Sequence, residues 1–290
     1  MKFAAIDIGS NAVRLQITGI LYSSKGIIFK KLEYVRFPLR LGREVFNEGQ
    51  ISHYQIERFL KLMKAFKLLI ELYEVTDCMA CATSAMREAT NGKEVIKKTK
   101  KDTGIEIEVI SGEKEARMIN DSITDHLDDK AYLHIDVGGG STELNMYLNG
   151  EKRMSESFEI GSVRRLQQRE NPEVWADIKK WVKNNLSGEV GKVIAVGTGG
   201  NINKMFDMAS VKKGKTMSLR KLRSIQKQIA GMGLEERINE LQLNPDRADV
   251  IVPASEIYIS VMQWARATSI LVPNAGLKDG MMKTMYKRNI

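Results

Sequence analysis

At 290 residues, with 43% hydrophobic and 28% charged residues, the chain has the composition of a soluble globular protein of two domains or one large one. No apolar run approaches the roughly 18 residues of a membrane span, and the first residues enter a strand rather than a signal peptide. We therefore expect a cytoplasmic protein with no membrane partner. The net charge of +9 favours a polyanionic partner or simply a basic surface. Because no nucleic-acid-binding signature accompanies it, we expect no nucleic acid partner.

The chain is predicted to open with strands over 3–7, 13–20 and 26–35. The turn between the first two holds Gly9, Ser10 and Asn11. Glycine lets a phosphate approach backbone amides closely, and the polar side chains add donors, so this turn is a candidate phosphate loop. Asp7 ends the first strand as a candidate metal ligand, and Arg14 follows the turn, where it can reach an anion.

Residues 38–49 carry glycine and charge and are predicted to form a loop, after which Ser52 caps a long amphipathic helix. A strand follows over 78–82. Its Cys78 and Cys81 have C-x-x-C spacing, but residues i and i+3 of a strand face opposite sides, which favours buried structural thiols over redox or metal chemistry.

Residues 83–91 begin polar at a strand end and become helical, which places Arg87 where it can meet an oxyanion. The alternative is a surface ion pair of Arg87 with Glu88 or Glu94. A further strand over 106–110 leads into a helix that starts near Ser111 and runs to about 125. Two acids, Glu113 and Glu115, stand two positions apart near its start, so we expect only one of them to point into a cleft.

The centre of the chain is the strand 132–137, followed by Gly138, Gly139, Gly140, Ser141, Thr142 and Glu143. Three glycines and two hydroxyls suit a phosphate, and the carboxylates of Asp136 and Glu143 are ligands that Mg²⁺ prefers. The alternative is a tight glycine turn in a hairpin. The pattern around Asp136 echoes that around Asp7, 129 residues earlier, as a duplicated pair of domains would.

The second half is predicted to contain a hairpin about Asn149-Gly150 and a third strand-then-glycine loop with Gly197 and Gly199. The amides of the short helix that begins near Gly161 are expected to hold phosphate. Helices are expected over 173–186, 219–241, 246–269 and 276–286. Alternating strands and helices indicate an α/β protein.

Seven segments occur in the order seen in one family, at 5–11, 82–87, 111–117, 135–143, 161–164, 197–200 and 247–249. Through them nearly the whole chain resembles the exopolyphosphatase/guanosine pentaphosphatase family of the actin-like ATPase superfamily. The resemblance implies two ribonuclease H-like lobes with an interlobe cleft, over 1–123 and 124–290, with the terminal helix 276–290 allowed to pack back on the first lobe. It also implies hydrolysis of a terminal phosphoanhydride bond with Mg²⁺ or Mn²⁺, in polyphosphate or in guanosine pentaphosphate, the alarmone of the stringent response.

The resemblance assigns the catalytic base to Glu115, the metal-site acid to Asp136 and the acid that closes the glycine loop to Glu143. Arg87 is expected to bind the terminal phosphate, and Asp7 or Glu143 to assist Asp136. Many relatives have Glu in place of Lys114. Longer relatives carry a further helical domain beyond the end of this sequence, from which we expect a preference for short polyphosphates or alarmone.

Two other functions stay open at this point. One is an actin-like-fold kinase that uses ATP, and the other is a non-catalytic sensor of alarmone or polyphosphate. The choice between polyphosphate and alarmone is open too, as is the oligomeric state, a homodimer included.

Overall fold

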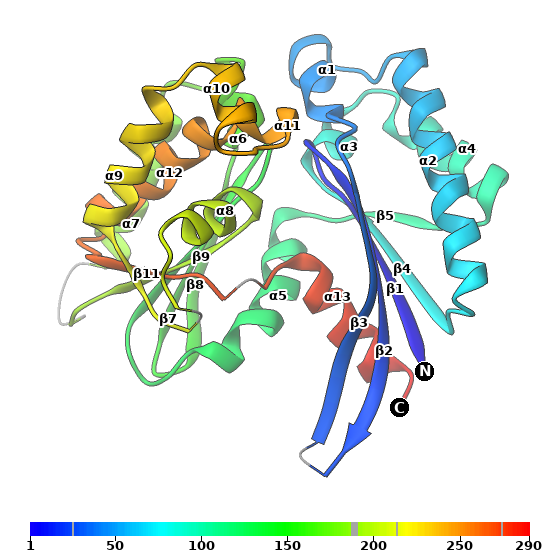
Figure 1. The fold of residues 1–290 in the computed structure, drawn as a ribbon, viewed down its shortest axis with the longest axis horizontal. Helices are drawn as coiled ribbons and strands as arrows, with labels where there is room; N and C mark the ends of the chain where they lie inside the picture. Colours follow the sequence, from blue (N-terminus) through cyan, green and yellow to red (C-terminus); the bar gives the residue numbers. More distant parts are fainter. Residues whose placement is uncertain (25, 187–190, 213, 274) are drawn as a thin grey trace. The chain divides into compact units, whose positions relative to one another are not determined.

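The computed structural model describes residues 1–24, 26–186, 191–212, 214–273 and 275–290, which form two compact units, each with its own sheet (Figure 1). The first unit is Met1–Ser122 with Leu277–Ile290, and the second is Ile123–Gly276. The terminal helix α13 (Leu277–Arg288) packs on strands of the first unit, the arrangement that the sequence analysis had allowed for.

The described part of the first unit contains a five-stranded sheet in the order β3-β2-β1-β4-β5. Its strands are β1 Lys2–Ile8, β2 Val13–Ser23, β3 Gly26–Phe37, β4 Asp77–Ala82 and β5 Ile107–Val109. β1, β2 and β3 are antiparallel, whereas β4 and β5 run parallel to β1. Alternate residues of a strand face opposite sides. Ile6 and Ile8 therefore enter the core, while Asp7 lies on the other face in one row with Arg14 and Cys81.

The helices between these strands are α1 Leu41–Glu48, α2 His53–Leu72, α3 Ser84–Glu88, α4 Gly92–Thr103 and α5 Gly112–Ile123. The cap of α2 is confirmed, since the Ser52 side chain accepts from the Gln55 amide at 3.3 Å. The predicted loop over 38–49 was wrong in part, because α1 forms there after Arg40 takes a left-handed conformation with φ of 60°.

The described part of the second unit has a six-stranded sheet in the order β10-β11-β9-β6-β7-β8. Its strands are β6 Tyr132–Val137, β7 Thr142–Leu148, β8 Glu151–Phe158, β9 Ile194–Thr198, β10 Met217–Ser218 and β11 Ser269–Leu271. Its helices are η1 Thr124–His126, α6 Ser162–Leu166, α7 Val174–Asn185, α8 Gly200–Met208, α9 Leu219–Ala230, α10 Leu234–Asn239, α11 Pro245–Ala248 and α12 Ile251–Trp264. Both Asn149 and Gly150 have positive φ, as the predicted hairpin turn requires.

The two units repeat one topology. Read from the opposite edge, the second sheet has the order β8-β7-β6-β9-β11, which matches β3-β2-β1-β4-β5 strand for strand, and β10 is added at the edge. Asp7 pairs in register with Arg14, and Asp136 pairs with Glu143 at the same spacing. The echo in the sequence therefore has a structural counterpart in these two hairpins.

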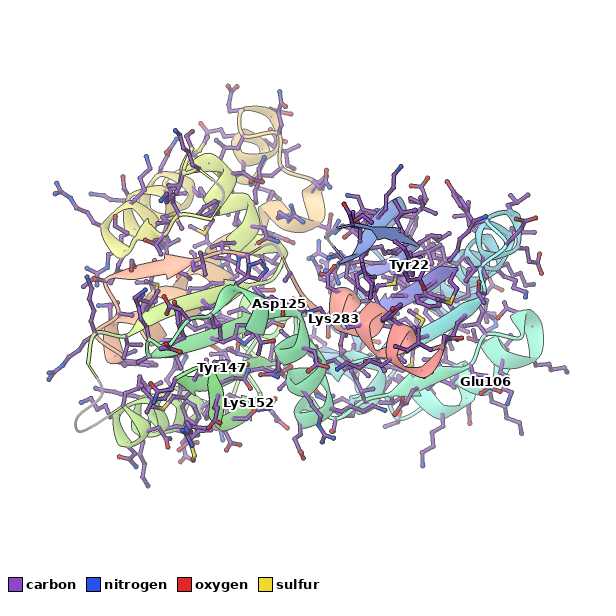
Figure 2. The ribbon with its side chains drawn as sticks, turned by 90° about the horizontal axis from the view of Figure 1, so that it is seen from below. Tyr22, Glu106, Asp125, Tyr147, Lys152 and Lys283 are labelled. Atoms are coloured by element: carbon purple, nitrogen blue, oxygen red, sulfur yellow. The ribbon has the colours of Figure 1, made fainter. Side chains whose placement is uncertain are left out.

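Helix α13 is fixed to the first unit by contacts along its length. Tyr286 meets Phe29 of the β2–β3 hairpin edge-on, with ring centroids 5.7 Å apart, and in Figure 1 the red helix lies along the blue hairpin. Lys283 donates to the carbonyl of Asp121 on α5 at 2.7 Å (Figure 2). The two hydrogen bonds from Arg288, at 2.6 and 2.7 Å, hold the pKa of the Asp77 carboxyl below its usual range. No helix among the described residues is long and apolar enough to cross a bilayer.

Candidate functional site

The turn between β1 and β2 has its carbonyl groups occupied. The amide of Gly9 donates to the Ala12 carbonyl at 3.2 Å and so closes the turn. This amide was predicted to donate to phosphate, and the structure uses it within the turn instead. The carbonyl of Ser10 accepts from the Gly42 amide at 2.8 Å, and that of Asn11 accepts from the Arg40 amide at 2.9 Å. The N–H and C=O of one trans peptide point in opposite directions. The amides of Asn11 and Ala12 are therefore directed away from α1.

The hydroxyl of Ser10, predicted as a phosphate donor, lies inside the first unit. Ser10 is 2% exposed, and its oxygen lies 2.8 Å from the Ser84 hydroxyl and accepts from the Ala85 amide at 3.3 Å. These contacts join the turn to the start of α3. Ser10 therefore holds the turn in position.

Two predicted arginines have clear contacts within the first unit. Arg14 donates to Asp7 at 2.7 Å, so the structure brings these two predicted site residues together as an ion pair. That pair compensates the charge of Asp7. Arg87 is exposed on α3 and donates to the carbonyl of Ile110 at 2.8 Å, which orients its guanidinium beside the loop before α5.

The acids at the start of α5 differ in surroundings. Glu113 is exposed and pairs with Arg117 at 3.0 Å, whereas Glu115 is half-buried with its Oε2 atom inside the protein. Lys114 turns to Glu108 of β5 at 2.5 Å. Only Glu115 of the two acids thus faces inward.

The pKa of Cys81 reflects its burial and the carboxylates around it. Burial first, and then the charges of Glu108, Asp7 and Glu115, raise the pKa of the Cys81 thiol to about 12, against an opposing effect of Lys114. Burial also raises the pKa of Cys78 to about 11. Both thiols are free and lie in β4 on opposite faces. Cys81 is buried but Cys78 is half-buried, so the expectation of buried thiols holds in full only for Cys81.

The glycine turn of the second unit repeats the first in more detail. The amide of Gly138 closes the turn on the Ser141 carbonyl at 3.0 Å and, like that of Gly9, is used within the turn. The carbonyl of Gly138 accepts from the Ser162 amide at 2.9 Å, and that of Gly139 accepts from the Val163 amide at 2.8 Å. The N-terminal amides of α6 therefore bind the turn, and the prediction that they hold phosphate was wrong.

Arg164 completes this contact. Its Nε donates to the carbonyl of Gly140 at 2.9 Å, and its amide donates to the Gly139 carbonyl at 3.1 Å. All peptide bonds described are trans. With three successive carbonyls held toward α6, the amides of Gly139, Gly140 and Ser141 point the other way. Successive amides that point to one side form the kind of concave site that binds anions.

Gly161 allows this close approach. A Cβ atom at Gly161 would lie 2.5 Å from the carbonyl carbon and oxygen of Gly139 and from the nitrogen of Gly140, a distance that real side chains do not show. Its φ of −151° is one that any residue adopts, so the glycine is required by space and not by conformation.

The two acids beside this turn lie opposite each other. Asp136 ends β6 and is in register with Glu143 of β7, so their Cβ atoms are about 5 Å apart. Glu143 is 1% exposed and accepts from the Ser157 hydroxyl at 2.9 Å. Burial, and then the charge of Asp136 and that of Glu143, raise the pKa of Tyr258 well above its ordinary value.

The remaining predicted residues have local roles in the second unit. Thr142 is fully buried and its hydroxyl donates to the Ile160 carbonyl at 2.6 Å. The prediction that this hydroxyl donates to phosphate was therefore wrong. Gly197 makes room for Ile270, whose Cδ1 would lie 2.7 Å from a Cβ there, and it faces the core rather than a ligand. Gly199 has φ of 114°, and a Cβ on it would lie 3.4 Å from Asp136 Oδ1.

A chain of hydrogen bonds crosses the sheet at His134 and Asn145, two residues along their strands from Asp136 and Glu143. The Ser155 hydroxyl donates to Asn145 Oδ1 at 2.7 Å, Asn145 Nδ2 lies 2.9 Å from His134 Nδ1, and His134 Nε2 lies 2.8 Å from Thr198 Oγ1. Because an amide nitrogen can only donate, His134 Nδ1 accepts and its Nε2 carries the proton. Burial, helped by Lys152, lowers the pKa of His134 to about 3, so the ring is neutral at pH 7.

Three residues matter more than the sequence indicated. The sequence marks Gly161 only as the start of a helix, and it places Tyr258 only within a predicted helix. The Tyr258 hydroxyl accepts from the Val137 amide at 3.2 Å and donates to the Thr198 carbonyl. Arg247 was noted only within a family segment. Its Nη2 would lie 3.1 Å from a Cβ on Gly200, at the start of α8. Each contact joins residues far apart in the chain, for which no local signal exists.

The donor set suits a metal that binds substrate as well as protein. No group of three or more His, Cys, Asp or Glu residues that could hold a metal occurs within the described ranges. Mg²⁺ is typically bound through one or two carboxylates, with water and phosphate oxygens completing six ligands. Asp136 and Glu143, opposed in register, fit that role, because a divalent cation beside them relieves the repulsion of two nearby carboxylates.

Comparisons with known proteins give a consistent result. The model of the Ppx/GppA phosphatase family matches residues 20–289. A bifunctional 3-dehydroquinate synthase/phosphatase of Fusobacterium nucleatum is 35% identical over 199 residues, 63% of this chain and 30% of that protein. Exopolyphosphatase 1 of Mycobacterium tuberculosis is 26% identical over 166 residues, 57% of this chain and 47% of that protein. The matched segment thus spans less than half the length of these relatives.

Solved structures match across the whole chain. An exopolyphosphatase from Cytophaga hutchinsonii has a TM-score of 0.85 at 24% identity, covering 99% of this chain and 98% of that one. The Aquifex aeolicus member of the Ppx/GppA family has a TM-score of 0.77 at 25% identity, covering 100% and 99%. The predicted α/β fold with two ribonuclease H-like lobes, the actin-like ATPase fold, is confirmed.

Proposed function

The chain belongs to the Ppx/GppA phosphatase family, and from this premise we propose that it hydrolyses the terminal phosphoanhydride bond of inorganic polyphosphate or of guanosine pentaphosphate by direct attack of water. The observation that carries the proposal is the glycine turn of the second unit, in which the carbonyls of Gly138, Gly139 and Gly140 all accept hydrogen bonds from α6. Relatives whose names include exopolyphosphatase support the substrate class.

Phosphate is held mainly by backbone amides. The amides of Gly139, Gly140 and Ser141 point to one side. Phosphoanhydride hydrolysis depends on positioning and on neutralising charge, with little covalent work for the protein. Amides fixed in advance supply that stabilisation without rearranging during the reaction. Arg87 adds a guanidinium for the terminal phosphate.

Asp136 and Glu143 would hold Mg²⁺ or Mn²⁺. The cation would neutralise charge on the phosphate oxygens during the reaction. Ser157 donates to the Glu143 carboxylate, so this acid is positioned before substrate arrives. Asp7 is not needed in this set, since it is already paired with Arg14.

Glu115 acts as the general base that orients the water and takes its proton. It is the inward-facing acid at the start of α5, and its family counterpart has this role by resemblance. A general base contributes about 10²- to 10⁴-fold to rate. Lys114 is directed to Glu108 rather than to Glu115.

The test compares Glu115→Gln with Glu113→Gln, an isosteric change two positions away on an exposed acid. Phosphate release from polyphosphate and from guanosine pentaphosphate is measured for both, together with substrate binding. We expect Glu115→Gln to bind normally and to lose about 10²-fold or more of its rate, and Glu113→Gln to match wild type. If Glu115→Gln works within a few-fold of wild type, the assignment of the base is wrong.

A further inference from the structure

The positive charge of the chain is concentrated in one segment of the second unit. Residues 208–234 contain no Asp or Glu and have seven cationic residues, which are Lys212, Lys213, Lys215, Arg220, Lys221, Arg223 and Lys227. The whole chain has 45 Lys and Arg residues and 36 Asp and Glu residues. Outside residues 208–234 there are 38 Lys and Arg and 36 Asp and Glu, so the remainder of the chain is nearly neutral. The net charge of +9 is thus mainly local, and a generally basic surface does not describe it.

Helix α9 presents most of this charge on one side. Leu222, Ile225 and Ile229 are buried at helical spacing, and the helix packs on α8 and α12 (Figure 1). The opposite side has Arg220, Arg223 and Lys227, all exposed. Arg220 and Lys227 are seven positions apart, so at a rise of 1.5 Å per residue the row of cations is about 10 Å long.

The described cations of this segment have no acidic partner within the part of the chain that the structure describes. Among the described residues, no carboxylate forms an ion pair with Lys212, Lys215, Arg220, Lys221, Arg223 or Lys227. Lys213 lies outside the described residues. Arg220 and Lys221 stand in the first turn of α9, where the helix dipole disfavours positive charge and where no acid is present. Arg223 and Lys227 add a like-charge pair at i,i+4, which is destabilising. The fold thus maintains an arrangement that an external anion would stabilise.

We infer that the exposed face of α9, with Lys212 and Lys215, is a binding surface for a linear polyanion, and that its ligand is inorganic polyphosphate. The identity of this ligand rests on the proposed function. The surface holds the chain of a long substrate by several salt-sensitive contacts, separately from the groups that act on its terminal phosphate. This affinity for long chains runs against the preference for short polyphosphates that the family resemblance led us to expect. Single-stranded nucleic acid is disfavoured, because such sites stack bases on aromatic side chains and no Phe, Tyr or Trp occurs between Phe206 and Tyr258.

The experiment uses a triple variant, Arg220→Gln, Arg223→Gln and Lys227→Gln. The matched control neutralises three exposed lysines of α4, which are Lys97, Lys98 and Lys101. Binding of long polyphosphate and of tripolyphosphate is titrated against salt in chelator, where no turnover occurs. RNA and poly-glutamate of equal charge are titrated in parallel.

We expect the α9 triple variant to bind long polyphosphate about tenfold more weakly, with a salt slope lower by about 2. Its binding of tripolyphosphate and its kcat on short substrate stay unchanged, its thermal stability does not fall, and the α4 variant matches wild type throughout. The inference is overturned if both triple variants lose affinity equally or neither does. It is overturned as well if RNA or poly-glutamate binds through α9 as tightly as polyphosphate. Because binding is measured without turnover, a protein that releases no phosphate would contradict the proposed function and leave this result intact.

Discussion

Replacing Gly161 by alanine tests whether the close contact between α6 and the glycine turn positions the site. The added Cβ would meet three backbone atoms of Gly139 and Gly140 at 2.5 Å, whereas ordinary contacts lie at 3.4–4 Å. The turn must therefore retreat by roughly 1 Å, and a displacement of that size at a reacting centre costs about 10²-fold in rate. Crowding of this kind also costs about 1–3 kcal/mol of stability.

The assay is kcat/KM for phosphate release, measured together with thermal unfolding so that lost activity is separated from lost fold. Gly276→Ala is the matched control, because nothing lies within 4 Å of a Cβ at that position. We expect Gly161→Ala to remain folded at assay temperature and to lose about 10²-fold in kcat/KM. If it keeps wild-type activity with unchanged stability, the amides of Gly139 and Gly140 do not hold the phosphate.

Three further outcomes are expected. Asp136→Asn should lower activity by about 10²-fold, with partial recovery at higher Mg²⁺ or Mn²⁺, and full activity of wild type in excess chelator would refute a metal role. The pKa of buried His134 falls from 6.5 to about 3 on folding, so between these values the unfolded state binds more protons. The free energy of unfolding should then decrease as the pH drops below 6.5, and His134 should contribute up to about 1.4 kcal/mol of this decrease per pH unit. Urea titrations of His134→Gln at several pH values should lack this contribution. Gly280→Ala would place a Cβ 1.9 Å from the Met118 carbonyl oxygen. The variant should therefore lower the free energy of unfolding of the first unit, measured in urea, by about 3 kcal/mol. A urea midpoint equal to that of wild type would contradict this close packing.

Local patterns predicted most of the fold. The strand-turn-strand segments after Asp7 and Asp136 were correctly placed because apolar runs that end in Asp and Gly are strong signals. The Asn149-Gly150 turn and the Ser52 cap follow from local backbone chemistry. Helix α1 was missed because it is short, begins at a left-handed Arg40 and contains Gly42, which is needed for contact with Ser10. β11 was missed because three residues give no periodicity.

The candidate site was predictable by residue type and less so by role. Both glycine turns were located, but the sequence gives no sign that α6 uses its amides to hold the turn more than twenty residues earlier. Thr142 has the right chemistry for phosphate, and only the position of the Ile160 carbonyl shows that its hydroxyl is engaged. The interlocking of Gly161 with Gly139 likewise depends on tertiary packing.

The most direct test of the central claim is orthophosphate release from polyphosphate, guanosine pentaphosphate and ATP, measured in parallel with Mg²⁺ present and absent. We predict Mg²⁺-dependent release from polyphosphate or guanosine pentaphosphate, well above that from ATP, and its loss in Glu115→Gln. Tight binding of either compound without release would indicate a sensor, and transfer of phosphate from ATP to an acceptor would indicate a kinase. Either result would contradict the assignment as a phosphoanhydride hydrolase.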